Sequence, residues 1–296
     1  MTPEPVTEQP AAEGADLDLR STTELVFLIN EADATVAGAV RAAAGELASA
    51  IDAIVDRLER GGRLVYAGAG TSGRLAAVDA AELPPTYGVA DDLVVALLAG
   101  GADNLTVAQE DAEDDADAGA ADVHSAGVGA NDAVVLLSAS GRTPYVLGAG
   151  RAARAVGALT VAVVCVPEPE LAAVADHVVA AVVGPEVIAG STRMKAGTAQ
   201  KLVLNTISTV AMVRLDRTYG NLMVEVVASN AKLRARARRT VELATGAGEA
   251  AVDGALEAAG GDPKVAIVSL LRDLDADDAR ARLAAAGGVV RKALDV

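Results

Sequence analysis

The chain has 296 residues, of which 52% are apolar and 22% are charged, a composition typical of a globular protein with a full-sized core. Lysine and arginine number 25 against 41 acidic residues, and the resulting net charge of −16 disfavours a nucleic-acid partner. Aromatic residues make up 2% of the chain, which leaves almost no surface for stacking bases. The length is enough for about two domains.

The first segment is rich in Pro, Glu and Ala without periodicity, and this composition predicts a disordered tail over residues 1–18. It lacks the charged and apolar regions of a signal peptide, and no apolar run in the chain approaches the length of a membrane span. We therefore expect a cytoplasmic protein with no membrane partner.

A capping box formed by Ser21 and Glu24 marks the start of helical structure. The periodic apolar residues behind it predict two helices, the second of which ends at Gly61 and Gly62.

Short apolar runs separated by helix-length stretches follow, at residues 63–67, 93–99, 133–139, 159–166 and 177–183. They are apolar on both faces and bounded by Gly, Asp or Pro, which indicates buried parallel strands. The pattern predicts an α/β fold with a doubly wound, mainly parallel five-stranded sheet.

From about residue 193 the pattern becomes helical, and glycine-rich breaks near 245–250 and 260–263 suggest a small helical C-terminal module. We expect one domain over residues 19–235, which includes the N-terminal helices and the sheet. The helical module would then span residues 236–296.

The loop after the first strand, GAGTSGR at residues 68–74, has the glycine spacing of a dinucleotide-binding turn. Such a fold also needs an acidic residue at the end of its second strand to bind the ribose hydroxyl. Here that strand ends in Ala99, Gly100 and Gly101, so the ribose acceptor is missing.

A second loop of related chemistry, SASGRT at residues 138–143, follows the third strand. Two such loops at the carboxyl ends of neighbouring strands can direct hydroxyls, backbone N–H groups and helix dipoles at one point. For either loop alone, simple helix capping would be an equally good explanation. Together they favour a phosphate pocket.

Both loops resemble those of the sugar isomerase (SIS) family of phosphosugar-binding domains. The resemblance is more specific to the etherase branch of that family, whose members remove the D-lactyl ether from C3 of N-acetylmuramic acid 6-phosphate. The matching blocks are residues 68–88, 99–101, 112–115, 138–149, 184–208 and 219–226. The similarity extends from about Leu19 to the C-terminus.

The resemblance implies a carbon–oxygen lyase of cell-wall amino-sugar recycling, which eliminates D-lactate and then adds water to give N-acetylglucosamine 6-phosphate. It implies no cofactor and a homodimer with the site near the subunit interface. Elimination beside an aldehyde needs one acid and one base but no metal. The chain has only two histidines, His124 and His177, and no cluster with metal-ligand spacing.

By the same resemblance, Glu82 corresponds to the proton donor for the leaving lactate and Glu113 to the base at C2. Pro84 and Pro85 are expected to stop the helix just after Glu82. Glu113 stands in an acidic run typical of a solvated face, and Glu110 is the main alternative for the base.

The predicted substrate and phosphate ligands are Thr71, Ser72, Ser138, Ser140, Thr143, Ser191 and Lys195. Arg74 and Arg142 either assist them or are surface charges. A Schiff-base role for Lys195 finds no support in the sequence, which gives no sign of a lowered pKa.

Three other functions compete with the etherase: a non-catalytic sugar-phosphate sensor, a phosphosugar isomerase, and a DNA-binding regulator with a sugar-sensing domain. The single sheet domain and the two glutamates favour the etherase, and the net charge disfavours the regulator. Cys165 lies in an apolar run and is interpreted as a buried structural thiol. Ala81 and Leu83 depart from the residues usual in the etherase branch, which leaves the packing around Glu82 open.

Overall fold

The computed structural model describes residues 5–11, 16–107, 110–225 and 231–295. The described contacts divide the chain into two compact units. The first unit, called here the sheet unit, comprises residues 1–81 and 92–211, and the second, the C-terminal unit, comprises residues 82–91 and 212–296. This division differs from the predicted boundary at residue 235, and it passes through two long helices.

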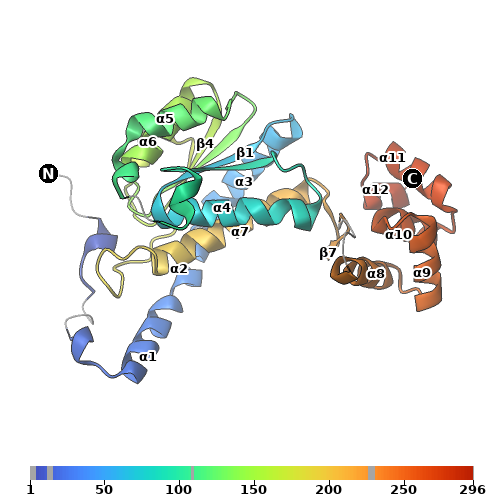
Figure 1. Ribbon diagram of the computed structural model, residues 1–296, viewed down its shortest axis with the longest axis horizontal. Helices are drawn as coiled ribbons and strands as arrows, with labels where there is room; N and C mark the ends of the chain where they lie inside the picture. The colour runs from blue at the N-terminus through green and yellow to red at the C-terminus, as the bar shows by residue number, and fades with distance from the viewer. Residues whose placement is uncertain (1–4, 12–15, 108–109, 226–230, 296) are drawn as a thin grey trace. The chain divides into compact units, whose positions relative to one another are not determined.

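The sheet unit is built on five parallel strands, which confirms the predicted fold class (Figure 1). They are β1 (Leu64–Gly68), β2 (Val94–Leu98), β3 (Ala133–Leu137), β4 (Leu159–Val164) and β5 (His177–Ala180). Their order is β2-β1-β3-β4-β5, so the direction of winding reverses between β1 and β3. In this register Gly68 pairs with Leu137, and both strands end at the same edge of the sheet.

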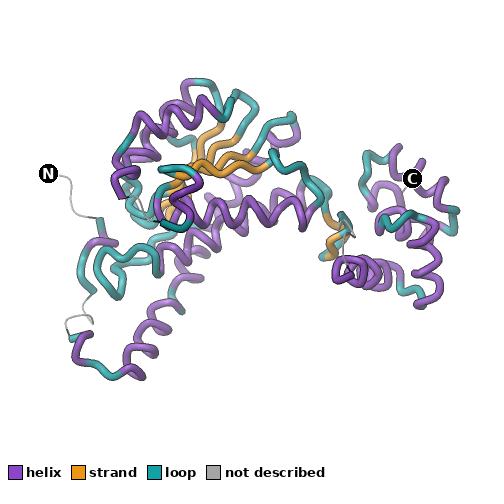
Figure 2. Tube along the Cα trace, in the orientation of Figure 1, coloured by secondary structure: helices purple, strands orange, loops and turns teal. Residues whose placement is uncertain are grey.

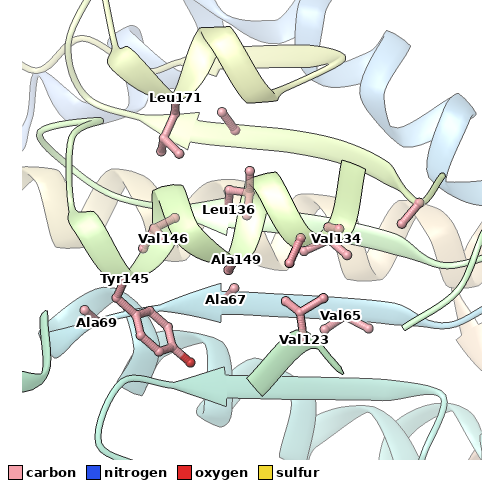
Figure 3. Packing of buried hydrophobic residues seen from close by; sticks show 14 of the residues in the cluster. Val65, Ala67, Ala69, Val123, Val134, Leu136, Tyr145, Val146, Ala149 and Leu171 are labelled. Atoms are coloured by element: carbon pink, nitrogen blue, oxygen red, sulfur yellow. The ribbon is translucent and has the colours of Figure 1, made fainter. Parts of the chain in front are cut away.

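Helices cover both faces of this sheet (Figure 1). They are α3 (Ala44–Glu59), α4 (Gly70–Tyr87), α5 (Ala116–Ser125), α6 (Pro144–Ala155) and α7 (Lys195–Arg214). On one face, Val65 of β1 and Leu136 of β3 pack with Val123 of α5 and Val146 of α6 (Figure 3). Strands that are buried on both faces explain why their sequences are apolar without alternation.

The opposite face is tied together by a buried carboxylate on α4. Asp79 accepts hydrogen bonds from the hydroxyl of Tyr66 at 2.8 Å, the amide of Asn205 at 2.7 Å and the hydroxyl of Ser208 at 3.1 Å. Burial raises the pKa of Tyr66 well above its usual value, and the nearby Asp79 raises it further. The neutral phenol therefore stays a donor, and β1, α4 and α7 are fixed to one another around the loop that follows β1.

The N-terminal helices number three among the described residues, where the sequence predicted two. They are α1 (Thr22–Asp33), α2 (Val36–Ala42) and α3, and the predicted capping box at the start of α1 is present. The break between α1 and α2 lies at Thr35, whose hydroxyl donates to the carbonyl of Ala32. A threonine hydroxyl bonded to the nearby backbone competes with the helical pattern, which periodicity alone does not reveal.

Two local predictions are wrong. α4 continues through Pro84 and Pro85 to Tyr87, although these prolines remove the N–H donors for the carbonyls of Ala80 and Ala81. In the tail predicted as disordered over residues 1–18, Val6–Glu8 and Leu17–Leu19 form 3-10 helices and Thr7 is buried. Residues 1–4 and 12–15 of that prediction lie outside the described residues.

The C-terminal unit is helical, as predicted, and has its own buried core. Its helices are α8 (Ala231–Thr245), α9 (Glu249–Ala258), α10 (Pro263–Arg272), α11 (Ala276–Ala285) and α12 (Val290–Asp295). A short hairpin, β6 (Thr218–Tyr219) and β7 (Leu222–Met223), precedes them (Figure 2). Val224, beside the hairpin, belongs to the same buried cluster as Val241 and Ile267, which accounts for a boundary earlier than residue 235.

Candidate active site

The glycine loop between β1 and α4 is shaped by Gly70. Its φ is +53°, a conformation that residues with a side chain rarely adopt. A Cβ at this position would also collide with the carboxylate of Glu113, which belongs to the segment 110–114 after β2. Glycine at position 70 therefore allows a carboxylate to lie directly against the N-terminus of α4.

The second loop, between β3 and α6, is organised by Ser138. Its hydroxyl is 2.7 Å from that of Thr143 and 3.4 Å from that of Ser140, and it accepts a hydrogen bond from the backbone of Gly141. Ser138 is 2% exposed. It stands behind the loop and holds the other two hydroxyls in place.

A cavity of about 400 Å³ opens where these loops meet, within the size range of small-molecule sites. Its lining consists of Glu8, Ala69, Gly70, Thr71, Ser72, Arg74, Asn104, Glu113, Ala139, Ser140, Thr143, Gly190 and Thr192. The loops follow the adjacent strands β1 and β3, between which the winding reverses, and open α/β sheets bind ligands at such a point. The N-termini of α4 and α6 border it, and their dipoles favour an anion.

Two cavity residues are held by partners behind them. Ser72 donates its hydroxyl proton to the side-chain carbonyl of Gln200 at 2.8 Å. Arg74 donates to the backbone carbonyl and the side chain of Asn104 at 2.9 and 3.1 Å, and Asn104 in turn donates to the carbonyl of Ala99. The cavity therefore has a positioned guanidinium as well as hydroxyl groups.

The structure brings five of the nine predicted site residues to this cavity: Thr71, Ser72, Glu113, Ser140 and Thr143. In the segment 190–195, Gly190 and Thr192 line the cavity, whereas the predicted Ser191 and Lys195 are not in its described lining. Arg74 contributes to the lining and the exposed Arg142 does not.

Lys195 has a different setting at the start of α7. Its ammonium donates to the carbonyl of Val183 at 2.8 Å, and its backbone N–H donates to the carboxylate of Glu186 at 3.0 Å. Glu186 is fully buried and also accepts from the backbone of Ala196 at 2.9 Å. This carboxylate caps α7, and Lys195 joins the cap to the end of the sheet.

Glu82 lies exposed on α4 and is absent from the described lining of the cavity. It belongs to the C-terminal unit, whereas the residues that line the cavity belong to the sheet unit. The side chain of Glu110, the alternative base, lies outside the described residues.

The cavity also contains a carboxylate that sequence reasoning missed. Glu8 belongs to the segment predicted as disordered, yet it lines the cavity beside Gly190. No local pattern marks it, because a single glutamate between prolines resembles any solvated tail.

Cys165 is a free, buried thiol, as predicted. Burial raises its pKa to about 12, with a further contribution from the charge of Glu186, so it is a poor nucleophile. Over the described ranges, no group of three or more His, Cys, Asp or Glu residues could hold a metal ion. None of the described helices is both long and apolar enough to cross a bilayer.

Two family patterns match the part of the chain that contains the five-stranded sheet. One is the glucokinase regulatory protein N-terminal SIS domain, over residues 46–153, and the other is the SIS domain, over residues 114–209. Together they include both loops of the cavity.

Relatives that are similar over nearly the whole chain identify the family more specifically than these two patterns do. Relatives named N-acetylmuramic acid 6-phosphate etherase include one from Rubrobacter xylanophilus, 56% identical over 98% of this chain and 95% of the relative. Another, from Streptomyces avermitilis, is 52% identical over 97% of this chain and 93% of its own. A third, from Deinococcus radiodurans, is 49% identical over 99% and 96%. Because this similarity covers the sheet unit and the C-terminal unit alike, the chain belongs to the N-acetylmuramic acid 6-phosphate etherase family.

Proposed function

We propose that this protein cleaves the D-lactyl ether of N-acetylmuramic acid 6-phosphate, a carbon–oxygen lyase reaction of cell-wall amino-sugar recycling. The products are N-acetylglucosamine 6-phosphate and D-lactate. The 56% identity to an etherase over nearly the full chain carries this proposal, and the cavity supports it with hydroxyl donors and a carboxylate at one point. A sugar phosphate is charged and does not cross a bilayer unaided, so we expect the reaction in the cytoplasm.

The phosphate would bind between the two loops. The hydroxyls of Thr71, Ser72, Ser140 and Thr143 can donate to its oxygens, and Arg74 supplies a positive charge at the edge of the cavity. The helix N-termini of α4 and α6 add their dipoles. Ser138 would contribute indirectly, because it sets the positions of Ser140 and Thr143.

Glu113 is the proposed base. In the ring-opened sugar the C1 aldehyde acidifies the hydrogen on C2, and the Glu113 carboxylate would take that proton. The electron pair forms the C2–C3 double bond as the C3–O bond breaks, and an acid protonates the departing lactate oxygen. Water then adds across the double bond, with its oxygen bonding to C3 and a proton returning to C2.

Glu82 is the proposed acid, and we propose that a second copy of the chain supplies it. Glu82 is absent from the described lining of the cavity in its own chain. Val78, one turn earlier on the same face of α4, is 61% exposed. An apolar residue beside the required acid suits an interface at which each α4 presents Glu82 to the partner's cavity.

The direct test is release of D-lactate from N-acetylmuramic acid 6-phosphate by the purified protein, with EDTA and without added cofactor. Glu113→Gln is expected to lower the rate about a thousandfold. Asp114→Asn, which alters an exposed neighbour, is the matched control. A folded wild-type protein that binds the sugar phosphate without releasing lactate would instead be a sensor.

A mixing experiment tests the shared site. Glu82→Gln and Glu113→Gln are each expected to be inactive, but their mixed dimers would contain one site with both glutamates intact. After subunit exchange at equal concentrations, about a quarter of wild-type activity should return. If both glutamates of a site came from one chain, mixing would restore nothing.

A further inference from the structure

The segment around Glu8 is anchored to the sheet unit at two points. Val6 packs against the core cluster that includes β1, β3 and α6. Thr7 is fully buried, and its carbonyl accepts a hydrogen bond from the backbone of Gly190 at 3.1 Å. Glu8 follows directly, so its backbone position is fixed on one side by these contacts.

The Glu8 side chain then enters the cavity described above. It is half-buried, and one of its carboxylate oxygens lies 2.7 Å from the point where a Cβ on residue 190 would be. Gly190 has a φ of +74°, so both the backbone conformation and the space favour glycine there. The neighbouring loop thus leaves room for this carboxylate as Gly70 does for that of Glu113.

Glu8 has a different chemistry from the other groups that would bind phosphate. An ionised carboxylate accepts hydrogen bonds and donates none. Phosphate oxygens are also acceptors and carry negative charge, so they would bind the hydroxyls and Arg74 and be repelled by Glu8. The partners left for Glu8 are the N–H and O–H donors of the sugar.

We propose that Glu8 is a substrate-binding residue, which accepts a hydrogen bond from a hydroxyl or amide N–H of the sugar and disfavours phosphate without a sugar. This inference rests on the proposed function for the identity of the sugar. The N-terminal segment would then help the site to select a sugar phosphate over free phosphate.

Glu8→Gln is the test, measured by isothermal titration with N-acetylglucosamine 6-phosphate and with inorganic phosphate. The sugar phosphate should bind about fivefold more weakly, because a charge-assisted hydrogen bond becomes a neutral one. Inorganic phosphate should bind about threefold more tightly, because a like charge is removed. Asp18→Asn, an exposed charge change in the described part of the N-terminal segment, should alter neither.

Weaker binding of the sugar phosphate together with tighter binding of inorganic phosphate would distinguish substrate recognition by Glu8 from a structural role. If Glu8 only held the fold of the segment, both affinities would fall together, and if it did not face the ligand, neither would change. Either result overturns the proposal. In the lactate assay KM should rise while kcat is kept. A lost kcat with unchanged binding would instead make Glu8 the proton donor.

The two binding titrations test the role of Glu8 independently of the proposed lactate release. A wild-type protein that releases no lactate but shows the two opposite shifts would overturn the etherase activity and leave the role of Glu8 intact.

Discussion

The hydroxyl proton of Ser72 is donated to the side-chain carbonyl of Gln200, and the same proton is needed to bind a phosphate oxygen. Gln200 is 1% exposed, and its side-chain nitrogen has no hydrogen-bond partner among the described residues. With the amide turned over, that nitrogen would donate to the Ser72 hydroxyl, which could then give its own proton to a phosphate oxygen. Gln200 would in this way control whether Ser72 can bind phosphate.

Gln200→Glu is therefore expected to weaken binding of N-acetylglucosamine 6-phosphate about tenfold, as measured by titration calorimetry. A carboxylate can only accept, so it keeps the Ser72 proton and adds a negative charge near the anion. Lys201→Gln, an exposed change on the same helix, is the control. Unchanged affinity in Gln200→Glu would contradict this role.

Asp132, just before β3, carries a prediction about pH. Burial alone would raise its pKa, but hydrogen bonds from Arg63 and Gly129 outweigh this effect and lower it. The pair with Arg63, at 2.9 Å, thus stabilises the fold above the unfolded pKa of about 4, and this stability is lost as pH falls through the lower folded value.

In urea unfolding between pH 2 and 7, Asp132→Asn should lower the free energy of unfolding by about 2 kcal/mol at neutral pH. It should cost progressively less as pH falls from about 4, where the unfolded Asp132 takes up a proton, through the lower folded pKa, below which the folded carboxylate is protonated as well. Asp56→Asn, in an exposed pair with Arg60, should change little at any pH. An equal loss at all pH values would exclude the proposed linkage.

At the scale of elements, α4 carries part of the cavity lining, a buried anchor and two exposed residues. Its N-terminus borders the cavity, its middle is held by Asp79, and its far part carries the exposed Val78 and Glu82. One helix therefore connects the loop that lines the cavity to the residues of the proposed interface.

Val78→Lys tests the proposed interface on α4. Because Val78 is 61% exposed, the stability of the isolated chain should change by less than about 0.5 kcal/mol. The dissociation constant of the proposed dimer should rise at least about tenfold, because a charge would be buried against a second copy. Light scattering over a dilution series measures this, with Leu243→Lys as the exposed control on α8. If dimerisation is unaltered, Val78 does not lie in the interface.

The sequence predicted the five strands closely, because strands buried on both faces leave long apolar runs between glycine-rich turns. It predicted Thr71, Ser72, Ser140 and Thr143 at one point because parallel strands end at a common edge. It misjudged α4, since proline only disfavours a continuing helix, and α4 continues through Pro84 and Pro85 with Leu83 buried beside them. The setting of Lys195 depends on Glu186, and that of Glu8 on Gly190; neither contact leaves a periodic pattern.

For the whole molecule, the position of the boundary between units leads to a prediction about truncation. A chain ending at residue 235, the boundary suggested by composition, keeps Val224 but loses Val241 and Ile267 from the same cluster. It should bind 8-anilinonaphthalene sulfonate strongly and aggregate on gel filtration, while the full chain does neither. A soluble truncated chain that unfolds at the full chain's Tm would contradict the assignment of Val224 to the C-terminal unit.

The division of the chain also has a consequence for its synthesis. Residues 82–91 belong to the C-terminal unit, yet the ribosome makes them about 120 residues before residue 212, where the rest of that unit begins. At typical elongation rates this is a delay of roughly ten seconds. During that interval the end of α4, with Glu82, has emerged without the partners of its own unit. The nascent chain therefore has a waiting period in which a chaperone that binds apolar segments can act on it.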